Sequence, residues 1–259
     1  MARERRSTGS RRLSGNLRVE NLSYGYRGGF RLSIEHLEFA DGVTCLLGPN
    51  GAGKSTFIRL VTTAVLPRDG SVFVGATDVR LNLREYRRQL GYLPQRFGMV
   101  NNYRVREMLE YAAWMKGVAK KDRPAAIERV AEQCDVTRFL SHRVSALSGG
   151  TLRRVGIAQA IVNSPRVIVL DEPTAGLDIV QQGQLYDVVR GLARSAVVVI
   201  STHSSSDVAE MGDAVVVFHN GATVFSGSVD SLATGESTSR RESLEEGYRA
   251  VIGASGQVR

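Results

Sequence analysis

The sequence predicts an α/β fold with a mostly parallel sheet, an N-terminal antiparallel β subdomain and an inserted α-helical subdomain. Three apolar runs, residues 43–47, 167–170 and 196–200, have the unbroken hydrophobicity of strands buried on both faces of a parallel sheet. Each run leads into a polar motif, which is expected because ligands bind at the carboxyl ends of such strands. Between the first two runs, residues 96–165 show helical patterns and little strand signal, which predicts the inserted helices.

The other elements are predicted from local patterns. Residues 17–22 and 31–39 alternate apolar and polar side chains, as strands with one buried face do. Residues 104–116 place apolar side chains near one face of a helix. Two later apolar segments flank a turn with Asn220-Gly221, which favours a tight β-hairpin. A capping-box pattern that begins at Ser239 predicts a final helix.

Composition limits the class of protein. The 259 residues are 42% hydrophobic and 23% charged, which is typical of a soluble globular domain. The apolar runs fall far short of the roughly 18 residues that span a bilayer, so work at a membrane is expected to need a partner. Neither Cys45 nor Cys134 belongs to a metal-binding spacing, and both fit a reducing cytoplasm.

The net charge of +8 is concentrated at the N-terminus. About half of the excess comes from five arginines and a single Glu4 within the first twelve residues. We therefore expect residues 1–16 to be a disordered basic tail, and we expect no specific nucleic-acid partner. One domain is expected over 17–253, with its helical subdomain at about 96–165 and a short tail at 254–259.

Residues 48–55 match the phosphate-loop pattern G-x-x-x-x-G-K-[ST] in full. Glycines let backbone N–H groups turn toward phosphates, and the following helix adds its positive end. We expect Lys54 to reach the β- and γ-phosphates and Ser55 to ligate Mg²⁺. The expected nucleotide ligands here are Gly48, Pro49, Asn50, Gly51, Ala52, Gly53, Lys54, Ser55 and Thr56.

Two carboxylates end the second apolar run. Residues 166–170 lead into Asp171 and Glu172, a weak signal alone that becomes strong about a hundred residues after a full phosphate loop. We expect Asp171 to hold Mg²⁺, and Glu172 to polarise the attacking water as a general base.

The most restrictive motif is Leu147-Ser148-Gly149-Gly150, at the start of a predicted helix. A serine and two small glycines at a helix N-terminus favour an anion. With this motif between the phosphate loop and the Asp-Glu strand end, the chain resembles the ATP-binding subunit of an ABC transporter. The resemblance implies a P-loop NTPase core that binds ATP and Mg²⁺.

The resemblance also implies composite active sites. In this family, Ser148, Gly149 and Gly150 would face the γ-phosphate that the opposing subunit holds, so that two chains enclose two ATP molecules. The family usually has Gln where this chain has Thr151. Because the serine and glycines make the main phosphate contacts, we expect this change to alter the activity of the motif and not to abolish it.

Four further positions match features of the family. Gln95, in Gly-Tyr-Leu-Pro-Gln, would sense Mg²⁺ and water as a catalytic and metal-contacting residue. Asp178, in Gly-Leu-Asp, would lie in the loop that crosses between subunits. His203 follows the third apolar run, where the family's switch histidine contacts the γ-phosphate. Tyr26 matches the aromatic residue that stacks on adenine; Tyr24 is the alternative, and a tyrosine that is simply packed or exposed is another.

The resemblance implies an ATP hydrolase bound to a membrane-spanning permease subunit at the cytoplasmic face of the membrane, paired with a second copy or a homologous ATPase subunit. A soluble ABC-type ATPase and a scaffold without turnover are the alternatives; Glu172 and His203 argue against the scaffold.

Residues 96–117 and 243–248 are similar to drug-, antibiotic- and lipid-exporting members, and the stretch after His203 is too short for the regulatory domain of many sugar importers. Export of a small molecule, lipid or peptide is therefore expected, with import as the alternative. Residues 97–103 are expected to border the groove for the membrane subunit.

Overall fold

The computed structural model describes residues 17–26, 28–233 and 239–256. The predicted basic tail, residues 1–16, lies outside the described residues, as do 257–259 at the other end. Within the described ranges, no helix is both long and apolar enough to cross a membrane.

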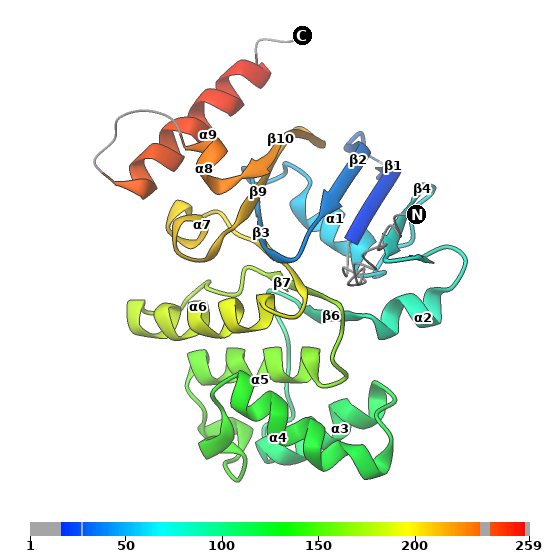
Figure 1. The fold of residues 1–259 in the computed structure, drawn as a ribbon, viewed down its shortest axis with the longest axis vertical. Coiled ribbons are helices and arrows are strands. Elements are labelled where there is room, and N and C mark those ends of the chain that lie inside the picture. Colours follow the sequence, from blue (N-terminus) through cyan, green and yellow to red (C-terminus); the bar gives the residue numbers. More distant parts are fainter. Residues whose placement is uncertain (1–16, 27, 234–238, 257–259) are drawn as a thin grey trace, which may run out of the picture.

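The predicted α/β architecture is confirmed, and it contains two sheets (Figure 1). The antiparallel sheet has the order β2 (Arg31–Phe39), β1 (Leu17–Gly25), β4 (Asp69–Val74) and β5 (Thr77–Asp78). The larger sheet has the order β10 (Ala222–Ser228), β9 (Ala214–His219), β3 (Gly42–Leu47), β8 (Val197–Ser201), β7 (Val167–Asp171) and β6 (Leu90–Leu93). All neighbouring strands of the larger sheet are parallel except β9 and β10, the predicted hairpin.

The apolar runs are explained by two cores on opposite faces of the larger sheet. Val167 and Val169 of β7 pack into a core with the antiparallel sheet and α1 (Lys54–Val61). Ile168 and Leu170 of the same strand pack into a core with helices on the other face. Since both faces of β7 are buried, its sequence is apolar without alternation.

Helices cover the second face of the sheet and extend from it. The segment from 96 to 165 contains α3 (Val105–Met115), α4 (Arg123–Gln133) and α5 (Gly149–Ile161), which group at one end of the molecule. α6 (Ile179–Ala193) lies between α5 and the strands (Figure 1). The remaining helices are α2 (Leu83–Arg88), α7 (Ser205–Met211), α8 (Val229–Leu232) and α9 (Arg240–Gly256).

The last helix begins as its capping pattern predicts, because the backbone N–H of Glu242 donates to Oγ of Ser239 at 3.2 Å. It runs to Gly256, into the stretch expected as a tail. Three strands, β4, β5 and β6, are absent from the sequence-based prediction, and β5 has only two residues. β4 begins with the turn-like Asp69-Gly70, and β6 has only four residues and contains Gly91. At Gly91 a side chain would meet the carbonyl oxygen of Ala160 at 2.7 Å, so contact with α5 requires glycine.

Candidate functional site

The loop between β3 and α1 is shaped by glycines. Gly51 and Gly53 have φ values of 80° and 114°, a region that favours glycine, and Gly53 lies at the N-cap of α1. Nζ of Lys54 donates to the carbonyl of Gly48 and, at 3.2 Å, to that of Pro49. Burial lowers the pKa of Lys54, and the nearby Glu172 and Asp171 oppose this effect. The loop therefore places a buried ammonium group beside two carboxylates.

Ser201 at the end of β8 organises the two carboxylates at the end of β7. Its hydroxyl donates to Oδ1 of Asp171 at 2.5 Å and accepts from the backbone N–H of Glu172 at 2.9 Å. The chain turns at Glu172 through a positive φ of 45°, which is costly for a residue with a side chain. Burial raises the pKa of Asp171 and the hydrogen bond from Ser201 opposes this shift. Ser201 was not among the predicted site residues.

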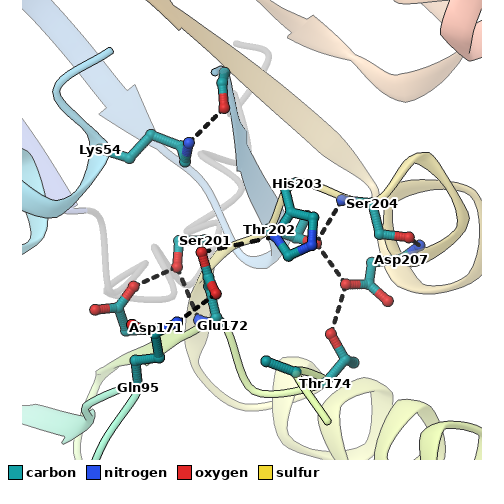
Figure 2. Close-up of polar contacts among 12 residues, drawn as sticks. Lys54, Gln95, Asp171, Glu172, Thr174, Ser201, Thr202, His203, Ser204 and Asp207 are labelled. Carbon is teal, nitrogen blue, oxygen red and sulfur yellow. Dashed lines mark hydrogen bonds and ion pairs between the residues drawn. The ribbon is translucent and has the colours of Figure 1, made fainter. Parts of the chain in front are cut away.

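The side chain of Glu172 contacts residues from the loops after β6 and β8. Nε2 of Gln95 lies 2.6 Å from its Oε2, and Nδ1 of His203 lies 3.7 Å from its Oε1. Figure 2 shows the side chains of Gln95 and His203 converging on this carboxylate. The structure thus joins three residues that lie far apart in the sequence.

A buried carboxylate supports the segment around His203. Asp207 is 2% exposed and accepts hydrogen bonds from the hydroxyls of Thr174 and Thr202 (Figure 2). It also accepts one from the hydroxyl of Tyr186 at 2.8 Å. Thr202 also accepts from the backbone N–H of Ser204 at 3.0 Å. This network connects the loop after Glu172 to the segment that presents His203. No motif pointed to it, because its members come from three separate segments, at Thr174, at Tyr186 and at residues 202–207.

A pocket of about 370 Å³ lies over the phosphate loop, within the range of small-molecule sites. It is lined by Tyr26, Phe30, Pro49, Asn50, Gly51, Ala52, Gly53, Lys54, Ser55, Thr56, Asp171, Glu172 and Ser201. Tyr26 therefore borders the pocket. The ring of Tyr24 packs edge-on against the ring of Tyr26, with 5.1 Å between the ring centroids. His203 lines a neighbouring cavity that shares Pro49.

The family model for the ABC transporter matches residues 36–175, which contain the phosphate loop, the Leu-Ser-Gly-Gly motif and the Asp-Glu pair. This chain belongs to the ABC transporter family. It is the ATP-binding subunit of such a transporter and an ATP hydrolase, as the family's ATP-binding domains are. The P-loop NTPase core predicted from the sequence is confirmed.

Several known proteins are similar to this ABC subunit. The molybdate/tungstate import ATP-binding protein WtpC of Methanocaldococcus jannaschii is 30% identical over 83% of this chain and 72% of that protein. The phosphonates import ATP-binding protein PhnC 2 of Synechococcus is 34% identical over 83% of this chain and 86% of that protein. The retinal-specific phospholipid-transporting ATPase ABCA4 of Mus musculus is 28% identical over 81% of this chain, but the match spans 9% of that protein.

A solved structure described as the ATP-binding subunit of an ABC transporter has the same fold. It aligns with a TM-score of 0.74 and 27% identity, over 91% of this chain and 98% of that one.

The Leu-Ser-Gly-Gly segment of this ABC subunit lies outside the pocket. Ser148 caps α5 by accepting from the backbone N–H of Thr151 at 3.3 Å, and the two hydroxyls lie 3.0 Å apart. A side chain at Gly150 would meet the side chain of Gln181 at 2.9 Å, so the start of α5 lies close to α6 at this point. Asp178 caps α6 through the backbone N–H of Gln181 at 2.8 Å. Ser148, Gly149, Gly150 and Asp178 are not among the residues that line the pocket within the described chain.

The donor set fits Mg²⁺. Ser55 and Asp171 both line the pocket and offer hydroxyl and carboxylate oxygens, which suit a hard cation. Because Nε2 of Gln95 is engaged by Glu172, its amide oxygen is the atom left for a cation. Mg²⁺ bound there would neutralise phosphate charge.

Proposed function

We propose that this chain hydrolyses ATP to drive transport through a separate membrane-spanning permease subunit, from the cytoplasmic face of the membrane. The observation that carries the proposal is the convergence of Lys54, Asp171 and Glu172 on one pocket, with Gln95 bonded to Glu172. The phosphate loop would bind the phosphates of ATP, and Tyr26 would stack on adenine. The phosphate loop and Tyr26 both line this one pocket.

We assign the proton-accepting role to Glu172. Its side chain is 22% exposed, so water can reach a carboxylate that stands beside the phosphate-binding loop. Gln95 would orient Glu172 through the 2.6 Å hydrogen bond, and His203, whose Nδ1 lies 3.7 Å from Glu172, would contact the γ-phosphate as the family resemblance implies. The meeting of these side chains at one edge of the larger sheet supports these roles.

Two copies of this chain, or one copy and a homologous ATPase subunit, would complete each site. Ser148, Gly149 and Gly150 lie outside the pocket of their own chain, where they can serve a second chain. Directly after Asp178, the aliphatic side chains of Ile179 and Val180 are 87% and 71% exposed. Adjacent exposed aliphatic groups support an interface at this loop.

We further propose export as the direction of transport. Residues 96–117 support it through their similarity to exporter-type members. Import is the alternative, since two of the relatives carry import in their names. The name of a third states phospholipid transport without a direction. Uptake and efflux of labelled candidate cargo in inside-out and right-side-out vesicles would separate the two directions.

The test of the proposed function is gentle detergent extraction of the tagged chain from its own cells, with identification of the proteins that co-purify. A polytopic membrane protein in roughly equal amount is the expected result. An ATP-hydrolysing chain that retains no membrane protein would overturn the transport proposal in favour of a soluble ABC-type ATPase.

A further inference from the structure

Arg153 joins two loops that carry proposed catalytic residues. It lies in the first turns of α5, shortly after Gly150. Its Nη1 donates to the carbonyl of Gln95 at 3.0 Å, and its Nη2 donates to the carbonyl of Ala175 at 3.4 Å. Gln95 follows β6 and Ala175 follows Glu172 at the end of β7. One planar guanidinium group therefore ties both loops to the helix that begins at Gly149.

The same side chain also holds the loop after Gln95 through an aromatic contact. The guanidinium carbon lies 5.4 Å from the ring centroid of Phe97. The ring also packs against α5 at Gly156, where a side chain would come within 2.9 Å of it. The segment from Gln95 to Phe97 is thus fixed at both its main chain and its ring.

The surroundings of Arg153 give it an electrostatic link to the site. Burial lowers the pKa of its half-buried guanidinium, whereas Asp171 and Glu172 oppose that shift. The attraction of the two carboxylates therefore favours the charged form of this guanidinium beside the site.

We propose that Arg153 is a positioning residue that sets the Gln95–Glu172 contact and transmits movements of α5 to it. The inference rests on the roles that we propose for Gln95 and Glu172. Because α5 starts at the Ser148-Gly149-Gly150 segment, a second chain engaging that segment would shift the helix and, through Arg153, both loops. A displacement of about 1 Å in such a site can cost about 100-fold in rate.

Single variants test the link in the full chain. Arg153→Ala should lower kcat for ATP at least about tenfold while the KM for ATP stays within about threefold, because the phosphate loop is untouched. Arg153→Lys should recover part of kcat, since an ammonium can keep one carbonyl contact but not the planar pair. The matched control is Arg129→Ala: Arg129 also has a pKa lowered by burial and also donates to a carbonyl, that of Val162 at 2.8 Å.

A double-mutant cycle separates positioning from a general effect on stability. If Arg153 acts through Gln95, adding Arg153→Ala to Gln95→Ala should change kcat by less than about twofold. Additive losses, or an Arg153→Ala enzyme no slower than Arg129→Ala, would show that the inference is wrong. If Glu172→Gln and Gln95→Ala themselves leave turnover unchanged, the proposed site fails and this inference fails with it. Loss in those two variants with wild-type turnover in Arg153→Ala overturns the role of Arg153 alone.

Discussion

The amide of Gln95 donates a 2.6 Å hydrogen bond to Glu172 across 77 positions of sequence. The two residues come from neighbouring strands, β6 and β7, whose carboxyl ends meet at the same edge of the sheet. The contact places an amide against a carboxylate that also faces His203. It links the segment that leads to the helical end of the molecule with the phosphate-binding pocket.

Glu172→Gln is expected to bind ATP with little change but to hydrolyse it about 10²–10⁴-fold more slowly, the usual size of a general-base effect. The amide keeps the shape of the side chain and removes its basicity. Phosphate release and nucleotide binding are measured on the same preparation. Glu246→Gln, at an exposed position on α9, serves as the control. Near-normal turnover of Glu172→Gln would show that another group is the base.

Lys54→Ala should weaken ATP binding by about 2–5 kcal/mol, because a buried charge partner of the phosphates is removed. Lys54 is 8% exposed, whereas Lys121 is an exposed lysine in the helical end and provides the control, Lys121→Ala. Isothermal titration at constant salt measures both affinities. Equal affinities for the two variants would argue against the phosphate-loop assignment.

Asp207→Ala should lower the free energy of unfolding by about 2–4 kcal/mol, because it leaves the buried hydroxyls of Thr174, Tyr186 and Thr202 without their acceptor. Asp207→Asn keeps one acceptor oxygen, so its free energy of unfolding should lie between those of the wild type and Asp207→Ala. As a control, Asp230→Ala removes an exposed ion pair with Arg240 and should cost less than about 0.5 kcal/mol. Denaturant unfolding measures all three; similar midpoints for Asp207→Ala and Asp230→Ala would contradict the network's importance.

Lys116→Met should stabilise the protein near neutral pH by about 1–2 kcal/mol, after allowance for solvent screening. Burial lowers the pKa of Lys116 from 10.5 to about 8, so between these values the unfolded chain binds a proton that the folded chain has released. Wild-type stability from this group therefore rises as pH increases from about 8 to 10.5, and the gain from Lys116→Met shrinks over the same window. Thermal unfolding across that range, with exposed Lys120→Met as control, measures the effect; a difference independent of pH would contradict it.

Val100→Asp should abolish retention of the membrane subunit while ATP turnover of the isolated chain stays within about twofold, as expected for an exposed surface position. Val100 is 51% exposed, unlike half-buried Phe97, whose ring contacts Arg153 and α5. Leu66 is 50% exposed and lies elsewhere, so Leu66→Asp is the matched control. Co-purification and ATPase rates are compared; full retention by Val100→Asp would remove residues 97–103 from the docking surface.

The fold class, the apolar parallel strands, the hairpin at Asn220-Gly221 and the phosphate loop could all be predicted from the sequence. Each of these depends on short-range chemistry: unbroken hydrophobicity, residues that accept a positive φ, and a glycine pattern before a lysine. Which polar side chains touch one another depends on how distant segments pack together, and the sequence did not predict it. Ser201 between Asp171 and Glu172, the hydroxyls around Asp207 and the span of Arg153 all join segments that are distant in the chain. Such contacts arise because parallel strands end side by side, and a local sequence pattern does not predict which strands will be neighbours.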